Sequence, residues 1–297
     1  MLQAILRRAL AALTVSLTLV AAPTMARPTQ VARPALWKVS DPDTTIYLFG
    51  TIHLLPPKYQ WRSAKLDKAM TDSQQLIVET LVDTQKFMAA MASLAFNTPN
   101  LPPLAERVPP AKRAALADLM RKAGVAPHAF DRMETWAPAI ILLNERFKEI
   151  GLQSDQGVEV VLRSTFASKS KPLGELETTA EQLGFFDALP EKAQRQLLEG
   201  AVDDPENMRK DFQGMLAAWV RGDVPAVART FNHDLSDSPA LQQALIKRRN
   251  ANWAKWIENR MTQPGEIMIA VGAGHLAGKD SVIALLQHDG YRVRRVQ

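Results

Sequence analysis

The chain of 297 residues contains no cysteine, and it has only five histidines. The lack of cysteine excludes disulfides, thiolate metal sites, a cysteine nucleophile and a lipidated cysteine. A metal site in this protein must therefore be built from histidine and carboxylate side chains. An exported protein without disulfides suits a bacterial envelope compartment, provided that its hydrophobic core is large enough.

Several common enzyme signatures are also missing. The sequence has no Gly-x-Ser-x-Gly, which makes a serine hydrolase with a nucleophile elbow a poor candidate. It has no His-Glu-x-x-His, which excludes an ordinary zincin. The run VGAGHLAG (Val271 to Gly278) lacks the Gly-x-Gly-x-x-Gly spacing, and Lys279 is not placed as a phosphate-loop lysine, so we reject nucleotide binding. The net charge of +5 comes from scattered basic residues, which argues against nucleic acid as a partner.

The N-terminal 26 residues have the pattern of a secretory signal. Two basic residues, Arg7 and Arg8, precede an apolar stretch from about Ala9 to Ala22, and the small residue Ala26 follows. The stretch is short for a membrane-spanning helix, which favours a cleaved signal. The alternative is that it stays on the protein as an uncleaved membrane anchor. We therefore expect export to the periplasm without a lipobox cysteine, and at most peripheral association with a membrane.

The rest of the chain predicts one α/β (α+β) domain over residues 37–297, after a flexible, proline-bearing lead-in over residues 27–36. Apolar runs predict strands over residues 36–41, 44–55, 76–79, 266–275 and 291–296, and a short strand that ends near Glu175 to Glu177. Helical spacing predicts helices over residues 109–124, 131–151, 279–290 and most of 180–262, with breaks near Pro190, Asp203–Pro205, Gly222–Pro225 and Ser236–Pro239. We expect a central mixed sheet of N- and C-terminal strands, a large helical insert, and helices on both faces.

Two of the five histidines follow a glycine at the same spacing. Gly50 to His53 ends one apolar run, and Gly272 to His275 ends another. Ligands of open α/β sheets gather beyond the carboxyl ends of the strands, and imidazole is a common metal ligand. The pattern therefore predicts that His53 and His275 meet at one metal ion. The alternative is that each histidine only fills a buried loop.

Two histidines bind a divalent ion poorly without a carboxylate. Glu79 is the best candidate because it ends the apolar run LIVE. Glu175 and Glu177 follow a short apolar stretch and come next. Asp155 and Glu159 are weaker candidates, because either residue can simply cap a helix.

A predicted helix carries Arg249 and Asn250 beside Trp253 and Trp256. Either this helix has a solvated face with docked tryptophans, or Arg249 and Asn250 point into the site. In the second case the guanidinium would neutralise a developing oxyanion or bind a carboxylate. The remaining histidines are expected to have no role in the site: His128, His233 and His288.

Taken together, the segments TIYLFGTIHLLPP, LIVET, GVEVVL, PLGELET, RRNANWAKWI and IAVGAGHLAGKDSVIALLQHDG resemble the TraB/GumN family of bacterial envelope proteins. The resemblance extends from about Pro34 to Val296. This family is similar to the animal TIKI metalloproteases and to pheromone-shutdown proteins, which implies a metal-dependent peptide hydrolase fold.

The family's motifs match this chain residue by residue. The paired motifs fall on Gly50–His53 and Gly272–His275, and the acidic residue after the second strand falls on Glu79. The acidic position of the family's Gly-Leu-Glu-Thr segment falls on Glu177, although Gly174 is displaced by one position here. Arg249 and Asn250 match the family's helical Arg-Asn pair.

These observations predict metal-assisted hydrolysis of a peptide or protein substrate. His53, His275 and a carboxylate, Glu79 or Glu177, would hold Zn²⁺, Mn²⁺ or Co²⁺. Glu79 would be a ligand or the general base, and Arg249 and Asn250 would hold substrate or charge. The alternatives are a non-catalytic envelope protein that binds a peptide, a metal or haem, and a scaffold in which both histidines are core residues.

Overall fold

The computed structural model describes residues 30–297, apart from residues 57–58, 82, 97, 99, 153–156 and 237, and it describes only the backbone of residues 232–236. The predicted secretory signal and the candidate Asp155 lie outside the described residues. Among the described residues, no helix has the length and the apolar composition that crossing a membrane requires.

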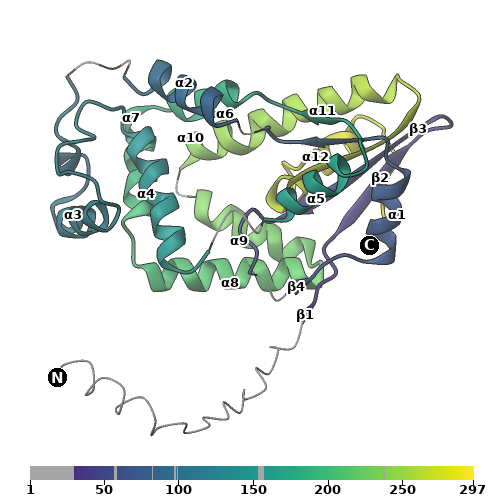
Figure 1. The fold of residues 1–297 in the computed structure, drawn as a ribbon, viewed down its shortest axis with the longest axis horizontal. Helices are drawn as coiled ribbons and strands as arrows, with labels where there is room; N and C mark the ends of the chain where they lie inside the picture. Colours follow the sequence, from purple (N-terminus) through teal and green to yellow (C-terminus); the bar gives the residue numbers. More distant parts are fainter. Residues whose placement is uncertain are drawn as a thin grey trace, which may run out of the picture.

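A six-stranded mixed sheet forms the centre of the fold, in the order β6-β5-β7-β3-β2-β8 (Figure 1). Four strands run parallel to one another: β3 (Thr44–Thr51), β5 (Gln75–Val78), β6 (Leu173–Glu175) and β7 (Gly265–Gly272). The strand β2 (Leu36–Ser40) is antiparallel to both β3 and β8 (Val293–Arg295). A second, two-stranded sheet pairs β1 (Gln30–Val31) with β4 (Tyr59–Gln60). The N- and C-terminal strands thus build one mixed sheet, which confirms the predicted architecture.

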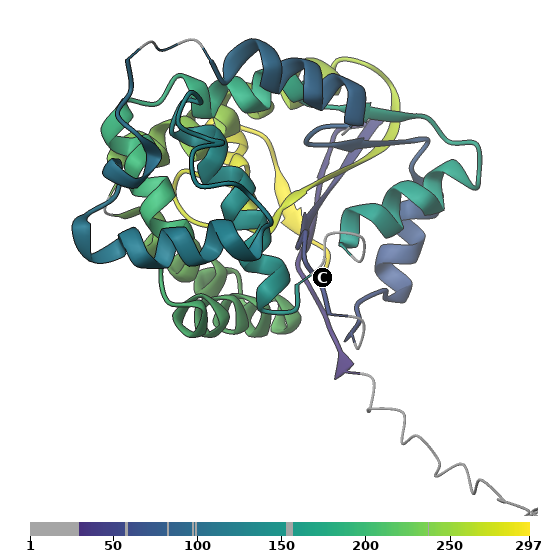
Figure 2. The ribbon, with the colours of Figure 1, turned by 60° about the vertical axis from the view of Figure 1, so that its left-hand side comes forward.

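Side chains of β3 alternate between two hydrophobic cores, one on each face of the sheet. Tyr47 and Phe49 pack in the core that also contains residues of α1 (Ala64–Asp72), α5 (Val158–Ala167) and α8 (Pro205–Arg221). Ile46 and Leu48 pack in the core formed with α11 (Arg248–Met261) and α12 (Val282–His288). Figure 2 shows the sheet nearly edge-on, with α1 and α5 to its right. Helices therefore cover both faces, as the sequence predicts.

The helical insert has cores of its own and lies away from the strands (Figure 1). Its helices are α2 (Thr84–Leu94), α3 (Arg113–Lys122), α4 (Trp136–Glu149), α6 (Thr179–Asp187), α7 (Glu191–Ala201) and α10 (Pro239–Gln242). The helix α9 (Val224–Ser236) packs instead on the core that also contains α8. Short 3₁₀ turns span Leu104–Glu106, Pro110–Lys112 and Ala273–Leu276, and a π-helical turn spans Gln243–Lys247. All four predicted helix breaks are present; for example, Gly222 ends α8 with φ of 64°.

The chain differs from the sequence-based prediction in two places. Both Gly-x-x-His strands are shorter than predicted, because the chain leaves the sheet at Thr51 and at Gly272, before either histidine. Residues 30–36 of the predicted lead-in make contacts with the rest of the fold. Ala32 is fully buried, and its N–H donates to the carbonyl of Gln60 at 2.9 Å. Pairing of β1 with β4 thus joins the start of this segment to residues that follow β3.

Candidate functional site

The parallel strands bring four candidate side chains to one edge of the sheet. Because β3, β5, β6 and β7 share a direction, their carboxyl ends meet at the same edge. His53 follows β3, Glu79 follows β5, Glu177 follows β6 and His275 follows β7. The sequence-based expectation that both histidines arrive at one rim is therefore met in the fold.

Gly272 lies where three of these side chains converge. Its N–H donates to Oε1 of Glu79 at 2.7 Å. A Cβ atom at Gly272 would lie 3.3 Å from Oε1 of Glu79, 3.6 Å from Cδ2 of His275 and 3.8 Å from Nε2 of His53. The missing side chain of Gly272 thus leaves a space that all three groups border.

Each histidine has an oxygen acceptor at its Nδ1 atom. Nδ1 of His53 lies 2.8 Å from Oε1 of Glu159, and Nδ1 of His275 lies 2.7 Å from Oδ1 of Asn250. An oxygen of this kind accepts a hydrogen bond from the Nδ1–H group, so in the neutral imidazole Nε2 keeps its lone pair. Such outer acceptors are what orient metal-binding histidines in general.

The two histidines differ in exposure and charge. Burial lowers the pKa of His275 to about 3 in spite of the nearby Glu79 carboxylate, so its imidazole is neutral at neutral pH. Desolvation would also lower the pKa of His53, but the charge and hydrogen bond of Glu159 outweigh it and raise that pKa to about 9. The side chain of His53 is 61% exposed, so water screens this pairing in part.

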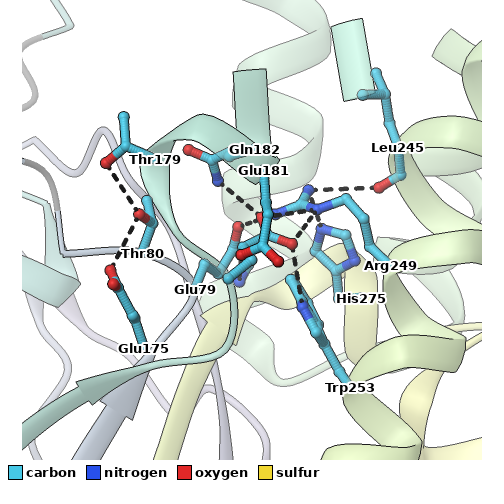
Figure 3. Close-up of polar contacts among 12 residues, drawn as sticks. Glu79, Thr80, Glu175, Thr179, Glu181, Gln182, Leu245, Arg249, Trp253 and His275 are labelled. Atoms are coloured by element: carbon cyan, nitrogen blue, oxygen red, sulfur yellow. Dashed lines mark hydrogen bonds and ion pairs between the residues drawn. The ribbon is translucent and has the colours of Figure 1, made fainter. Parts of the chain in front are cut away.

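Arg249 joins the two buried carboxylates and His275 (Figure 3). Its Nη2 atom lies 2.7 Å from Oε2 of Glu79, and its Nε atom donates to Oε1 of Glu177 at 3.0 Å. Its Nη1 atom lies 3.3 Å from Nε2 of His275. The guanidinium carbon is 4.7 Å from the centre of the Trp253 ring, a cation–π contact. Arg249 is thus a fixed cation at the centre of the cluster.

The surroundings of Glu79 keep its carboxylate charged. Burial by itself would raise the pKa of Glu79, but His275, Arg249, His53 and the Gly272 N–H lower it to about 2. Desolvation would lower the pKa of Arg249, but the charges and hydrogen bonds of Glu79 and Glu177 outweigh it and raise that pKa. Buried ion pairs of this kind are stable only when their hydrogen bonds are complete.

The other candidate residues hold the cluster in place. Both oxygens of Glu177 are occupied, since Trp253 Nε1 donates to Oε2 at 3.2 Å and Gln182 Nε2 donates to Oε1 at 3.1 Å, in addition to Arg249. Asn250 is fully buried, and its amide nitrogen donates to the Asp280 carbonyl at 2.7 Å. These contacts place Glu177 and Asn250 as partners of Arg249 and His275, respectively.

Two acidic residues lie in places that the sequence did not indicate. Glu175 accepts the Leu81 N–H at 2.6 Å and so fixes the loop after β5, apart from the Arg249 cluster. Glu159, a weaker candidate for the carboxylate of the site, pairs with His53 and accepts a hydrogen bond from the Thr51 hydroxyl. Its place in the first turn of α5 was visible in the sequence, but no local signal showed that α5 packs beside His53.

Phe231 was missed altogether. Its ring centre lies 6.0 Å from that of His275, and a Cβ atom at Gly274 would come within 2.5 Å of the ring. A glycine two residues after Gly272 is the one hint that something approaches closely there.

The donor chemistry suits a divalent ion, but the ligands are not assembled around one. Among the described residues, no group of three histidine, aspartate or glutamate side chains is arranged to hold a metal. Oε2 of Glu79 and Nε2 of His275 both face Arg249 instead. Beside the Gly272 space, His53 and Glu79 present the donor atoms Nε2 and Oε1, whereas His275 presents its ring carbon Cδ2.

Comparison with known proteins agrees with these motifs. The model of the TraB/PrgY/gumN family matches residues 35–295. The chain is 26% identical over 241 residues to YbaP, an uncharacterized protein of Escherichia coli (strain K12), with 81% of this chain and 87% of YbaP covered. YbaP of Shigella flexneri matches to the same extent, and no solved structure matches. Because the family model spans almost all of the described residues, the chain belongs to the TraB/PrgY/gumN family.

Proposed function

We propose that this protein is a metal-dependent hydrolase of peptides, with His53, His275 and Glu79 as the metal-binding residues. The observation that supports this proposal is the arrangement around Gly272. Both histidines have Nδ1 on an oxygen acceptor, and the Nε2 side of His53 borders the same space as Oε1 of Glu79. Nitrogen and oxygen donors without sulfur suit Zn²⁺, Mn²⁺ and Co²⁺ alike. A bound ion would supply a Lewis acid and lower the pKa of a coordinated water.

The residues around this space would have different roles in the proposed site. Glu159 and Asn250 orient His53 and His275, which limits the motion of both imidazoles. Glu79 is a carboxylate at neutral pH, and its low pKa favours a role in binding cations over a role as general base. An efficient general base has a pKa near the working pH.

Arg249 is the group suited to charge that develops on a substrate. Its guanidinium is fixed by Glu177 and Glu79, and it lies 3.3 Å from Nε2 of His275. A fixed cation stabilises an oxyanion without having to reorganise during the reaction. Glu177 serves this function by holding Arg249, because both of its oxygens already accept hydrogen bonds.

The cellular setting is part of the same proposal. We propose that the N-terminal 26 residues direct export, and that the protein acts on peptides or proteins in the periplasm. The sequence pattern of basic start, apolar stretch and small residue supports this location.

Elemental mass spectrometry of the purified mature protein tests the proposal. We expect about one equivalent of a transition metal in the native protein and none in His53→Ala/His275→Ala, with an unchanged circular dichroism spectrum. His288→Ala, which changes an exposed histidine, is the matched control and should keep the metal. Peptide libraries are then screened with Zn²⁺, Mn²⁺ and Co²⁺. A protein that takes up none of the three ions would rule out a metallohydrolase.

A second candidate function is non-catalytic binding of a peptide, a metal or haem in the envelope. The observation that favours it is the closed network of Arg249, which takes up Oε2 of Glu79 and both oxygens of Glu177. Glu79→Gln separates the two. A hydrolase loses turnover when this carboxylate is lost, whereas a binding protein has no turnover in either form.

A further inference from the structure

A pocket of about 470 Å³ opens beside the cluster, between α6 and α11. Its apolar lining residues are Leu176, Phe185 and Trp253, and the small residues Gly184 and Ala188 also line it. The remaining lining residues are polar or charged: Glu177, Glu181, Arg248 and Asn252. A volume of this size accommodates an apolar side chain together with part of a peptide backbone.

The pocket adjoins the Arg249 cluster. Glu177 lines the pocket and also accepts hydrogen bonds from Arg249. The ring centre of Phe185 lies 5.9 Å from the guanidinium carbon of Arg248 and equally far from that of Arg249. A ligand that packs on Phe185 therefore lies next to the cation that borders His275.

Arg248 is the cation that this pocket offers to a ligand. It is exposed, and among the described residues no carboxylate lies within ion-pair distance of it. Glu177 is paired with Arg249, and the carboxylate of Glu181 caps α6 by accepting from the Thr178 N–H at 2.7 Å and from its hydroxyl at 2.8 Å. The guanidinium of Arg248 is therefore available for a bidentate pair with an incoming carboxylate.

We infer that this pocket binds a large apolar side chain of a peptide, and that a carboxylate next to that side chain pairs with Arg248. The inference rests on the proposed function in taking the ligand to be a peptide. The carboxylate is either the C-terminal group of the peptide or the side chain of an adjacent acidic residue, and both have the same chemistry at Arg248. The pocket would thus set substrate specificity.

Gly184 allows the pocket to be filled without touching the site. A Cβ atom at Gly184 would have no neighbour within 4 Å, and the residue lies inside α6, where leucine is a better helix former than glycine. Gly184→Leu should therefore fold and occupy the pocket. Gly200→Leu in α7 is the matched control, because a Cβ atom there also has open space but does not line the pocket. Ala188→Leu is a second filling variant, should Gly184→Leu fail to fold.

The experiment measures fluorescence anisotropy of labelled hexapeptides with the mature protein. The probes are an alanine peptide ending in phenylalanine with a free carboxylate, its C-terminal amide, the amide with aspartate before the phenylalanine, and an all-alanine peptide with a free carboxylate. We expect the first probe to bind about tenfold or more tightly than the all-alanine peptide, since an aromatic side chain is buried. Gly184→Leu should remove this preference and Gly200→Leu should keep it.

Arg248→Gln tests whether Arg248 is the residue that pairs with the carboxylate of the peptide. In the native protein the probe with a free C-terminal carboxylate, the probe with aspartate, or both should bind more tightly than the plain amide, by about threefold to tenfold. Arg248→Gln should abolish that difference. Equal binding of the plain amide and both carboxylate probes by the native protein would overturn the role of Arg248.

Failure of this inference can be told apart from failure of the proposed function. If the native protein binds the phenylalanine probe but hydrolyses no peptide with any of the three ions, the result supports the role of the pocket and refutes the hydrolase. If peptides are hydrolysed with equal kcat/KM by the native protein and Gly184→Leu, the result supports the hydrolase and refutes the role of the pocket in peptide binding. A native protein that shows no preference for phenylalanine over alanine also refutes the pocket.

Discussion

Nδ1 of His275 lies 2.7 Å from Oδ1 of Asn250, the residue that follows Arg249 on α11. The amide nitrogen of Asn250 donates to the carbonyl of Asp280, which fixes the orientation of the amide. Because an amide oxygen only accepts, Nδ1 is the protonated nitrogen of His275, and Nε2 keeps a lone pair. Asn250 thus selects the imidazole tautomer that can bind a metal through Nε2.

Replacing Asn250 by alanine should weaken metal binding more than it weakens the fold. Without its acceptor, His275 loses its fixed orientation, and we expect the metal affinity to fall by about 10-fold to 100-fold. The free energy of unfolding should fall by about 1–3 kcal/mol, because Asn250→Ala leaves buried partners without a hydrogen bond. Isothermal titration with Zn²⁺ and urea unfolding measure the two effects. Asn259→Ala, an exposed position on the same helix, is the control, and an unchanged affinity in folded Asn250→Ala would contradict the assigned role.

Glu159→Gln should lower the pKa of His53. The glutamine retains an oxygen acceptor for Nδ1 but removes the negative charge that raises this pKa to about 9. We expect the value to move towards the 6.5 of a free histidine, as followed by NMR titration of the imidazole. Glu206→Gln, at the start of α8, should leave the titration of His53 unchanged. A His53 pKa that is the same in both variants would mean that Glu159 does not control it.

The strands and their carboxyl-end residues could be predicted from the sequence because buried parallel strands have continuous apolar runs. The run from Ile46 to Phe49 pairs with the run from Ile267 to Ala270, so the two strands end at the same edge, at Thr51 and Gly272. The parallel arrangement then places His53 and His275 together without further information.

The contacts of these side chains could not be predicted, because they depend on how distant helices pack. Glu159 reaches His53 only because the start of α5 lies against the residues that follow β3, where a Cβ atom at Gly157 would collide with the carbonyl of His53. The division of Arg249 between Glu79 and Glu177 likewise depends on the position of α11 over the sheet. The spacing of these residues along the chain predicts neither the contact of Glu159 with His53 nor the contacts of Arg249.

Gly272→Ala should impair metal binding with little effect on the fold. The backbone of Gly272 has φ of −50°, which alanine adopts readily. The added methyl group would lie 3.3 Å from Oε1 of Glu79 and fill the space that His53 and His275 also border. We expect the affinity for Zn²⁺ to fall by about tenfold or more, with a change of about 1 kcal/mol or less in the free energy of unfolding.

Gly200→Ala adds the same methyl group in α7, where nothing lies within 4 Å, and it should bind Zn²⁺ as the native protein does. Native affinity in Gly272→Ala would show that the metal, if it binds, lies elsewhere.

Arg249→Met should destabilise the protein strongly. The substitution leaves Glu79 and Glu177 buried without their counter-charge, and breaking a buried ion pair in this way costs about 3–5 kcal/mol. Arg248→Met, one residue earlier and exposed, should change the free energy of unfolding by about 0.5 kcal/mol or less. Urea unfolding compares the two variants. Equal stability of Arg249→Met and the native protein would mean that the carboxylates become protonated without cost.

The stability of the metal-free protein should be greatest near pH 6.5. The pKa of His275 is about 3 in the folded state and 6.5 in the unfolded state, so the unfolded chain binds more protons between these values, and stability falls as the pH drops below 6.5. The pKa of Glu79 is about 2 in the folded state and 4.5 in the unfolded state, so Glu79 adds to this loss of stability below pH 4.5. His53 acts in the opposite direction. Its folded pKa of about 9 exceeds 6.5, so its contribution is complete below pH 6.5 and is lost as the pH rises through 9.

Urea midpoints measured in the presence of EDTA from about pH 4 to about pH 10 test this optimum. His53→Gln should remove the decline between pH 6.5 and pH 9 and leave the decline on the acid side, because His53 is the one of these three groups whose pKa is raised. His288→Gln alters an exposed histidine paired with Asp289 and should leave the alkaline decline in place. If the native protein and His53→Gln lose stability equally between pH 6.5 and pH 9, the pairing of His53 with Glu159 does not stabilise the folded state.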